Sequence, residues 1–357
     1  MAEEKTILVT GGCGFIGSHF VRLCLKEGYH VVNLDALTYA ASESTLKDIN
    51  ESEPNYHFEK GYIQDRPLIK SLLLKYKPCA LVNFAAETHV DRSIESPNQF
   101  IDSNILGTFT LLDESRHYYD DLDPAEKTQF KFLHVSTDEV FGSCSGEPFP
   151  EEAPYNPSSP YSASKAAADF IVRSYFHTYG FPVLITNCTN NYGPNQFPEK
   201  LIPLMIIKAN NQESLPIYGD GMQIRDWLYV EDHVEAILTV LEKGKEGETY
   251  NIAGLNGEVP NKTVVEELCH ILDELAPRPN DLAYKDLITY VTDRPGHDFR
   301  YALSIEKIKN ELGWSPKVNF KEGLKQTVEW YLKNKWWWEE ILDKGYKANR
   351  MGLRKTA

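Results

Sequence analysis

The chain has 357 residues, of which 42% are hydrophobic and 25% charged, and its formal net charge is −15 at neutral pH. This composition is typical of a globular protein with one large or two closely joined domains. The acidic charge repels a phosphate backbone, which argues against nucleic-acid binding, so an anionic ligand must be met by a few local cations.

The compartment can be judged from the first residues and the cysteines. The N-terminal residues run into an apolar strand without a signal-peptide pattern, and no apolar run is long enough to span a membrane. The six cysteines are scattered, with no Cys-x-x-Cys pair and no metal-ligand spacing. We therefore expect reduced thiols, no metal site, no membrane association and a cytoplasmic location.

The first elements predict a dinucleotide site. An apolar run at residues 6–10 leads into Gly11, Gly14 and Gly17, spaced to allow a tight turn, a close approach to a pyrophosphate and helix packing. A second apolar run ends at Asp35, whose carboxylate accepts hydrogen bonds from a ribose diol and repels a 2′-phosphate. No arginine follows in residues 36–39. The pattern therefore predicts NAD rather than NADP.

Further along the chain, strand-like and helical patterns alternate. This alternation predicts a Rossmann-type, doubly wound parallel α/β sheet. The strand-like runs lie at residues 56–60, 80–85, 130–136 and 182–187, and helical patterns include residues 97–118 and 161–179. Between them, the acidic residues 120–127 are expected to form a solvated loop.

Regular alternation is lost after residue 192, where prolines and glycines become frequent. We predict an NAD-binding domain at residues 1–192, to which segments such as 225–252 return. Residues 193–345 are expected to form mainly a smaller, irregular α/β substrate lobe, and 346–357 a tail. The three tryptophans at 336–338 are compatible with either an interface or a packed chain end.

Two groups of residues predict chemistry. The apolar run from Phe132 breaks off into Thr137, Asp138 and Glu139, which places two carboxylates at a strand end, where a doubly wound sheet binds ligands. Tyr161 and Lys165 lie one helical turn apart. An ammonium near a phenol lowers the phenol pKa, which makes the phenolate a base for a hydroxyl proton during hydride transfer.

The motifs together resemble a known family. The stretches 10–17 and 161–165 are typical of the extended short-chain dehydrogenases/reductases, and the stretches 85–93 and 186–194 extend the match over nearly the whole chain. Ser136-Thr-Asp-Glu-Val140 and Asp293-Arg-Pro-Gly-His297 narrow the resemblance to the nucleoside-diphosphate-glucose 4,6-dehydratases.

The resemblance implies a reaction on dTDP-glucose. Tyr161 would act as base while NAD oxidises C4, and Thr137 would bond the C4 oxygen. Glu139 would remove the C5 proton, and Asp138 would protonate the departing C6 hydroxyl. NADH would then return its hydride to C6, giving a 4-keto-6-deoxy sugar. Adjacent acids titrate as a coupled pair, so one can stay protonated while the other is ionised.

The resemblance also implies the binding residues and a homodimer formed through the helices at 97–118 and 161–179. The implied NAD positions are Gly11, Gly14, Phe15, Ile16, Gly17, Asp35, Ala36, Leu37, Thr38, Tyr62, Ile63, Phe84, Ala85, Ala86, Ser103, Tyr161, Lys165 and Asn191. The implied substrate positions are Thr88, Thr137, Asn190, Lys200, Leu201, Pro216, Ile217, Tyr218, Arg225, Asn261, Asp293, Arg294 and His297.

The chain departs from the family pattern at three positions. Tyr62 replaces an aspartate that bonds the adenine, Phe141 replaces a common tyrosine, and Ala253 replaces a frequent glycine. Three alternatives also stay open at this point. A UDP-glucose 4,6-dehydratase differs only in the base pocket, a sugar-nucleotide 4-epimerase needs no adjacent acid and base, and an NAD-binding sensor needs no catalytic residues.

Overall fold

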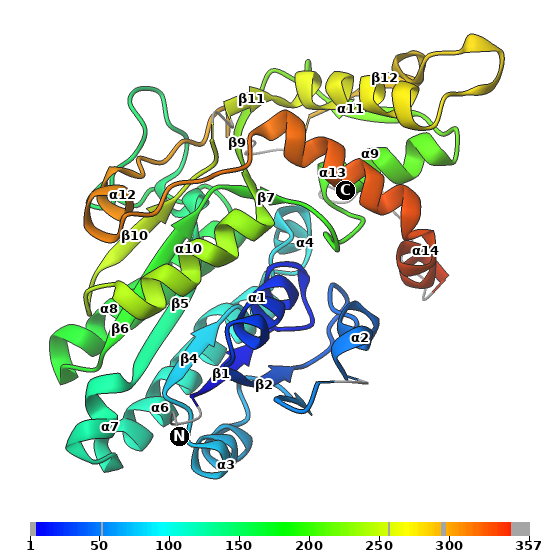
Figure 1. Ribbon diagram of the computed structural model, residues 1–357. Helices are drawn as coiled ribbons and strands as arrows, with labels where there is room; N and C mark the ends of the chain where they lie inside the picture. The colour runs from blue at the N-terminus through cyan, green and yellow to red at the C-terminus, as the bar shows by residue number, and fades with distance from the viewer. Residues whose placement is uncertain (1–4, 51–52, 256–257, 294–297, 344–357) are drawn as a thin grey trace.

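The computed structural model describes residues 5–50, 53–255, 258–293 and 298–343, and its centre is a seven-stranded sheet (Figure 1). The strand order is β10-β6-β5-β4-β1-β2-β3, and every neighbouring pair is parallel. The strands are β1 (Thr6–Thr10), β2 (His30–Asp35), β3 (Tyr56–Lys60), β4 (Ala80–Asn83), β5 (Lys131–Thr137), β6 (Val183–Cys188) and β10 (Thr249–Ile252). This arrangement confirms the predicted doubly wound α/β fold.

Helices cover both faces of this sheet. The principal helices near it are α1 (Phe15–Lys26), α3 (Arg66–Tyr76), α6 (Thr108–Asp121), α8 (Pro160–Tyr179), α10 (Val230–Lys243) and α12 (Glu306–Leu312). Side chains of a strand alternate between the faces. Ile7 and Val9 of β1 accordingly pack in the core beneath α1 and α10, whereas Leu8 packs in the core beneath α3, α6 and α8.

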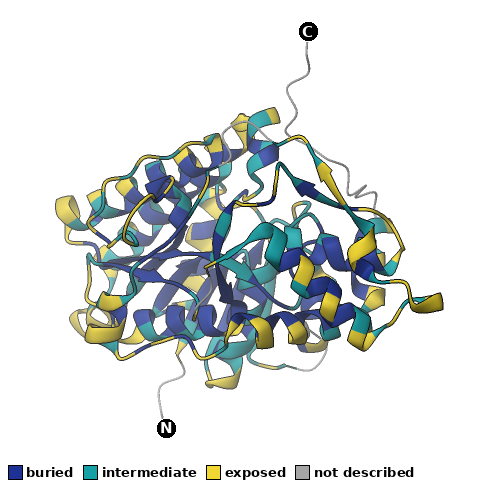
Figure 2. Ribbon diagram, turned by 90° about the horizontal axis from the view of Figure 1, so that it is seen from above, coloured by how far each residue is buried: buried dark blue, intermediate teal, exposed yellow. Residues whose placement is uncertain are grey.

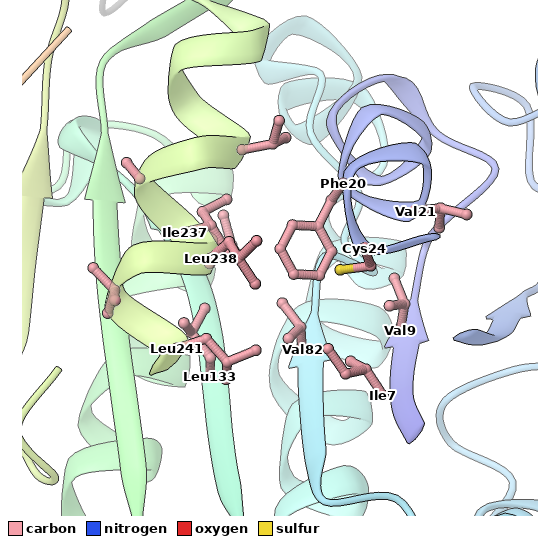
Figure 3. Close-up of a cluster of buried hydrophobic side chains, with 14 of the residues drawn as sticks. Ile7, Val9, Phe20, Val21, Cys24, Val82, Leu133, Ile237, Leu238 and Leu241 are labelled. Carbon is pink, nitrogen blue, oxygen red and sulfur yellow. The ribbon is translucent and has the colours of Figure 1, made fainter. Parts of the chain in front are cut away.

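The packing of α1 against α10 explains why a late segment returns to the first sheet. Figure 3 shows Ile237 and Leu241 of α10 facing Phe20 and Cys24 of α1 over the strands. These apolar side chains are buried, and their burial stabilises the contact. β10 then adds to the sheet edge beside β6.

A smaller lobe contains two short sheets and a second apolar core. One sheet has the order β11-β9-β7 and the other pairs β12 with β8. Its elements are β7 (Asn190–Tyr192), β8 (Leu215–Tyr218), β9 (Ile224–Tyr229), β11 (Glu258–Pro260), β12 (Ile288–Val291), α9 (Leu201–Asn210), α11 (Asn261–Leu275), α13 (Phe320–Lys333) and α14 (Lys335–Asp343). The domain boundary at residue 192 stays a prediction.

Shorter helices connect these elements, and two of them correct the sequence-based expectations. They are α2 (Lys47–Asn50), α4 (Val90–Glu95), α5 (Pro97–Phe100), α7 (Pro124–Gln129), the 3₁₀ turns η1 (Glu43–Leu46), η3 (Asp138–Phe141), η4 (Pro279–Asp281) and η5 (Tyr284–Leu287), and the π-helical η2 (Ile101–Gly107). The expectation of a loop at residues 120–127 is wrong, because residues 124–127 belong to α7. Asp123 caps the start of this helix through a capping box. The expected helix at 97–118 contains the π-helical segment.

Burial follows the layers of the fold. Figure 2 shows dark, buried strands surrounded by helices that turn exposed residues outward. Of the three tryptophans, Trp337 and Trp338 are buried and Trp336 is 51% exposed. Burial within the chain favours a packed chain end over an interface for this segment. The predicted tail at 346–357 lies outside the described residues. Within the described ranges, no helix is long and apolar enough to cross a membrane.

Candidate active site

A cleft opens at the carboxyl edge of the large sheet, where the strand order reverses between β1 and β4. Its walls are the turns after β1, β2, β3 and β4, the end of β5, the start of α8 and residues 188–200. All five predicted catalytic residues line it, namely Thr137, Asp138, Glu139, Tyr161 and Lys165. The predicted NAD positions also line it, except Leu37, which packs against the core beside β2.

The glycine turn has no room for side chains. Gly11 has a φ of +74°, and a Cβ there would lie 2.8 Å from the backbone nitrogen of Ala85. A Cβ on Gly17 would lie 2.2 Å from the carbonyl oxygen of Gly11. No side chain caps the start of α1, so its first amides are open to an anion. This cradle fits a pyrophosphate.

Asp35 is held at the end of β2 by two backbone amides. Its Oδ2 accepts from the Cys13 amide at 2.9 Å and its Oδ1 from the Leu37 amide at 2.8 Å. Burial raises the pKa of Asp35, while both amides oppose that rise. On the same wall, Tyr62 is 60% exposed, so its ring offers a surface to a flat base.

Asp138 and Glu139 follow β5 in a 3₁₀ turn that Thr137 caps. The Thr137 hydroxyl accepts from the Glu139 amide at 3.3 Å and donates to Asp138 Oδ1 at 3.1 Å. Burial, and next the charge of Glu139, raise the pKa of Asp138 well above its ordinary value. Asp138 can therefore stay protonated near neutrality.

Tyr161 and Lys165 stand on the first turns of α8, which Ser159 caps through a capping box with Ser162. Burial, and next the charge of Glu139, raise the pKa of Tyr161, whereas a hydrogen bond with the Thr137 side chain lowers it. Both side chains reach the cleft. The helix therefore places the predicted base beside the 3₁₀ turn that carries the two acids.

The ammonium of Lys165 is turned to the backbone rather than to the phenol. Its Nζ donates to the carbonyl oxygen of Val135 at 2.8 Å and lies 3.2 Å from His134 Nε2. No hydrogen bond joins Lys165 to Tyr161 in the described part of the chain. Burial lowers the pKa of Lys165 to about 8, and the charge of Asp169 opposes this. A buried ammonium needs acceptors, and Val135 supplies the nearest one.

The predicted substrate positions divide between the cleft and the smaller lobe. Thr88, Thr137, Asn190 and Lys200 line the cleft, and Lys200 Nζ donates to the Thr88 carbonyl at 3.1 Å. Arg294 and His297 lie outside the described residues. The other positions, Leu201, Pro216, Ile217, Tyr218, Arg225, Asn261 and Asp293, are in the smaller lobe and do not line the cleft. Arg225 is 5% exposed, and its guanidinium donates to the carbonyls of Ile224 and Asp298.

Comparisons with known proteins identify the family of the chain. A family model described as GDP-mannose 4,6 dehydratase matches residues 8–327. The dTDP-glucose 4,6-dehydratase of Xanthomonas campestris pv. campestris is 54% identical over 349 residues, covering 97% of this chain and 99% of that protein. The chain belongs to the dTDP-glucose 4,6-dehydratase family. The resemblance stated from the motifs is thereby confirmed.

Solved structures of the same family share the fold. The dTDP-glucose 4,6-dehydratase of Bacillus anthracis, solved in complex with NAD, has a TM-score of 0.82 and 46% identity, covering 94% of this chain and 99% of that one. The Streptomyces venezuelae dTDP-glucose 4,6-dehydratase, solved with NAD bound, has a TM-score of 0.85 and 42% identity over the same shares.

Two buried carboxylates of this family member were not predicted from the sequence. Glu87 and Glu199 line the cleft, and burial raises the pKa of each. The Tyr39 hydroxyl donates to Glu199 Oε1 at 2.9 Å. Glu87 follows β4 as Asp138 follows β5, so the argument that acids after a strand end lie at the ligand site also applies to Glu87. No spacing in the sequence points to Glu199.

One acidic group outside the cleft has the geometry of a cation site. Asp113, Glu114 and His117 lie close together on α6. Arg66 Nη1 already pairs with Asp113 at 2.7 Å and with Glu114 at 2.8 Å. The prediction that the protein uses no metal stays a prediction.

Proposed function

We propose that the protein is an NAD-dependent hydro-lyase that converts dTDP-glucose into dTDP-4-dehydro-6-deoxy-glucose and water. The observation that carries this proposal is the meeting of Asp138 and Glu139 with Tyr161 in one cleft beside a dinucleotide cradle. Relatives that match nearly the whole chain have the same activity in their names.

The residues present fit NAD. The cradle after β1 excludes side chains, the open amides of α1 suit a pyrophosphate, and Asp35 suits a ribose diol. Tyr62, in place of the aspartate usual in this family, offers its ring to the adenine. NAD, when bound, takes up a hydride from C4 of the sugar and gives it back at C6.

The side chains at the end of β5 and the start of α8 would move the protons. Tyr161 takes the proton of the C4 hydroxyl, and Thr137 holds the C4 oxygen. The C4 ketone then acidifies the C5 proton, which Glu139 removes. Asp138, kept protonated by burial and by the charge of Glu139, gives its proton to the departing C6 hydroxyl.

Polar groups around the sugar position would bind its hydroxyls and the diphosphate. Asn190 and Glu199 each have a buried side-chain oxygen without a hydrogen-bond partner among the described residues, and both line the cleft. Lys200 supplies a cation on the same wall, which suits an anionic substrate in an acidic protein. The predicted substrate roles of the residues in the smaller lobe remain part of this proposal.

A mass-resolved turnover assay tests the function. The protein is incubated with dTDP-glucose and with UDP-glucose in parallel, and the masses of the products are measured by mass spectrometry. We expect a dTDP-sugar lighter by one water. A C4-inverted sugar of unchanged mass would identify a 4-epimerase, and bound NAD without turnover would identify a sensor. A faster reaction with UDP-glucose would correct the base preference.

We also propose that the protein acts as a homodimer in the cytoplasm. Phe109 of α6 is 37% exposed and Phe170 of α8 is 57% exposed, and these two helices pack against each other. Exposed aromatic side chains on neighbouring helices are typical of a contact surface. The six cysteines, all of which are free, support a reducing compartment.

A further inference from the structure

Lys165 carries its charge in a place that bulk water hardly reaches. It is 3% exposed, and its Nζ donates to the carbonyl oxygen of Val135 at 2.8 Å. A carbonyl is a dipole and cannot balance a full charge, so a buried ammonium also needs a carboxylate nearby. The proposed reaction depends on this ammonium, because its charge favours the phenolate of Tyr161.

The carboxylate on the inner side of Lys165 is that of Asp169, which lies one turn further along α8 and is 0% exposed. His134 of β5 lies between the two groups. Its Nε2 is 3.2 Å from Lys165 Nζ and 3.5 Å from Asp169 Oδ1. Burial, and next the charge of Lys165, lower the pKa of His134, so its ring stays neutral. An uncharged imidazole therefore separates the ammonium from the carboxylate.

Hydrogen-bond donors favour the ionised form of Asp169. Its Oδ2 accepts from the Ser136 hydroxyl at 2.8 Å and from the Tyr155 hydroxyl at 2.9 Å. Arg173 Nη2 donates to the same Tyr155 hydroxyl at 2.8 Å. Burial raises the pKa of Asp169, and the charge of Lys165 is the largest of the causes that oppose this rise. The carboxylate is thus held by donors on one side and by an ammonium on the other.

We propose that Asp169 is a positioning residue that keeps Lys165 an ammonium and thereby lets Tyr161 act as the base at C4. This inference rests on the proposed function. Asp169 does not line the cleft, so it acts through Lys165 and not on the substrate. No proton passes to Asp169, which stays a carboxylate throughout the reaction.

The other groups around the pair do not supply this negative charge. The titratable or charged groups that face Lys165 and Asp169 are His134 of β5, Tyr155, Tyr161 and Arg173 of α8, and Cys188 of β6. Burial raises the pKa of the thiol and of the Tyr155 phenol, so both stay neutral. The guanidinium is itself a cation. In this set, the only anion besides the phenolate that Lys165 serves is therefore Asp169.

The pH dependence of the first hydride transfer tests this role. The NAD-loaded enzyme is mixed rapidly with dTDP-glucose at several pH values, and the absorbance of enzyme-bound NADH is followed. An ammonium is lost as the pH rises through its pKa, so the rate should fall on the alkaline side. Asp169→Asn keeps the shape without the charge, and it should move this fall to lower pH by about one unit or more.

Tyr155→Phe is the matched control. It removes one hydrogen bond from Asp169 and keeps the carboxylate, so the alkaline fall should stay in place. Unchanged NAD content and an unchanged circular dichroism spectrum show that both variants are folded. An unmoved fall in Asp169→Asn, or an equal shift in Tyr155→Phe, would overturn the proposal, since packing and not charge would then matter.

A double-variant cycle tests the same pair through stability, without turnover. Asp169→Asn leaves the Lys165 ammonium buried without its counter-charge, so the urea midpoint of the NAD-loaded enzyme should fall. Addition of Lys165→Met removes that charge, and the double variant should be more stable than Asp169→Asn alone. A double variant that is no more stable would overturn the pairing.

The outcomes also separate this role from the function. A wild type that forms NADH from dTDP-glucose but releases no lighter sugar would overturn the dehydratase function and leave the role of Asp169 intact. A wild type that forms no NADH would overturn the function, and the stability cycle would then decide whether Asp169 balances Lys165.

Discussion

At the scale of single residues, the proposed mechanism gives the neighbouring acids Asp138 and Glu139 different tasks. Asp138 is 3% exposed and accepts a hydrogen bond from the Thr137 hydroxyl, and its pKa is raised well above the ordinary value. Glu139 shares the same cleft, and its charge is the second cause of that rise, after burial. The charge on one acid therefore helps to keep the other protonated, which an elimination across two carbon atoms requires.

The first residue-scale prediction concerns Glu139 as the C5 base. Glu139→Gln keeps the shape but cannot take a proton. We expect this variant to form NADH on the enzyme when dTDP-glucose is added, as measured by absorbance. It should incorporate no solvent deuterium at C5, as measured by mass spectrometry. Normal incorporation would mean that another group removes this proton.

A second residue-scale prediction concerns Asp226 of β9, which accepts from the Gly254 amide at 3.3 Å. Burial raises its pKa from 3.8 to about 7. Between these values the folded protein holds a proton that the unfolded chain has lost, so the free energy of unfolding falls as the pH rises. Above the folded pKa both states are ionised, and the decrease ends.

Asp226→Asn cannot ionise and should remove this slope. Relative to the variant, the wild type should lose up to about 1.4 kcal/mol of unfolding free energy per pH unit within the window. Urea unfolding of both proteins at several pH values between the ordinary and the raised pKa measures the difference. If the unfolding free energies of the two proteins changed in parallel with pH, the Asp226 carboxyl would ionise in the folded protein as it does in the unfolded chain.

At the scale of elements, α14 ties the C-terminal part of the described chain to the first domain. The Trp337 indole donates to Thr45 Oγ1 at 3.2 Å, and its ring packs edge-on against Trp330 of α13. Thr45 lies in η1, in the segment after β2, and earlier residues of this segment, Thr38 and Ala41 among them, line the cleft. The helix therefore braces a segment that follows Asp35.

Substitution of adjacent tryptophans tests this brace. Trp337→Ala should lower the free energy of unfolding by about 3–5 kcal/mol, because it leaves a cavity and an unpartnered Thr45 hydroxyl. Trp336→Ala is the matched control, since Trp336 is 51% exposed, and it should change the value by less than about 1 kcal/mol. Urea unfolding measures both. Similar losses in the two variants would contradict a specific role of Trp337.

At the scale of the whole molecule, several large apolar side chains stay exposed on the helices that cover one side of the large sheet. They are Ile101 and Leu106 of η2, Phe109 of α6, and Phe170 and Tyr179 of α8. The same helices cover one side of the large sheet through their buried residues. Assembly through these side chains would leave the cleft open, because the cleft lies at the carboxyl edge of the sheet.

Sedimentation velocity tests the assembly. The wild type should sediment as a dimer, and Phe170→Glu should shift it toward the monomer, because a charge in an apolar interface must be desolvated. Leu282→Glu is the control, since Leu282 is 50% exposed in the smaller lobe. A monomeric wild type, or a dimer that tolerates Phe170→Glu as well as Leu282→Glu, would contradict the proposed interface.

Local patterns in the sequence determined the fold class and the centre of the site. The glycine spacing, the acid at the end of β2 and the end of the apolar run that begins at Phe132 are each patterns of a few consecutive residues. Parallel strands bring such strand ends to one edge of the sheet. The four-residue spacing of Tyr161 and Lys165 likewise predicted one helical face. These features are readable because the backbone period alone relates them.

Only the tertiary structure decided the contacts between distant segments. It turned the Lys165 ammonium to the Val135 carbonyl, joined Glu199 to Tyr39 and buried Trp337 against Thr45. It also returned β10 to the first sheet. No spacing along the chain encodes such pairs, because they depend on which buried polar and apolar groups find partners once the layers have packed.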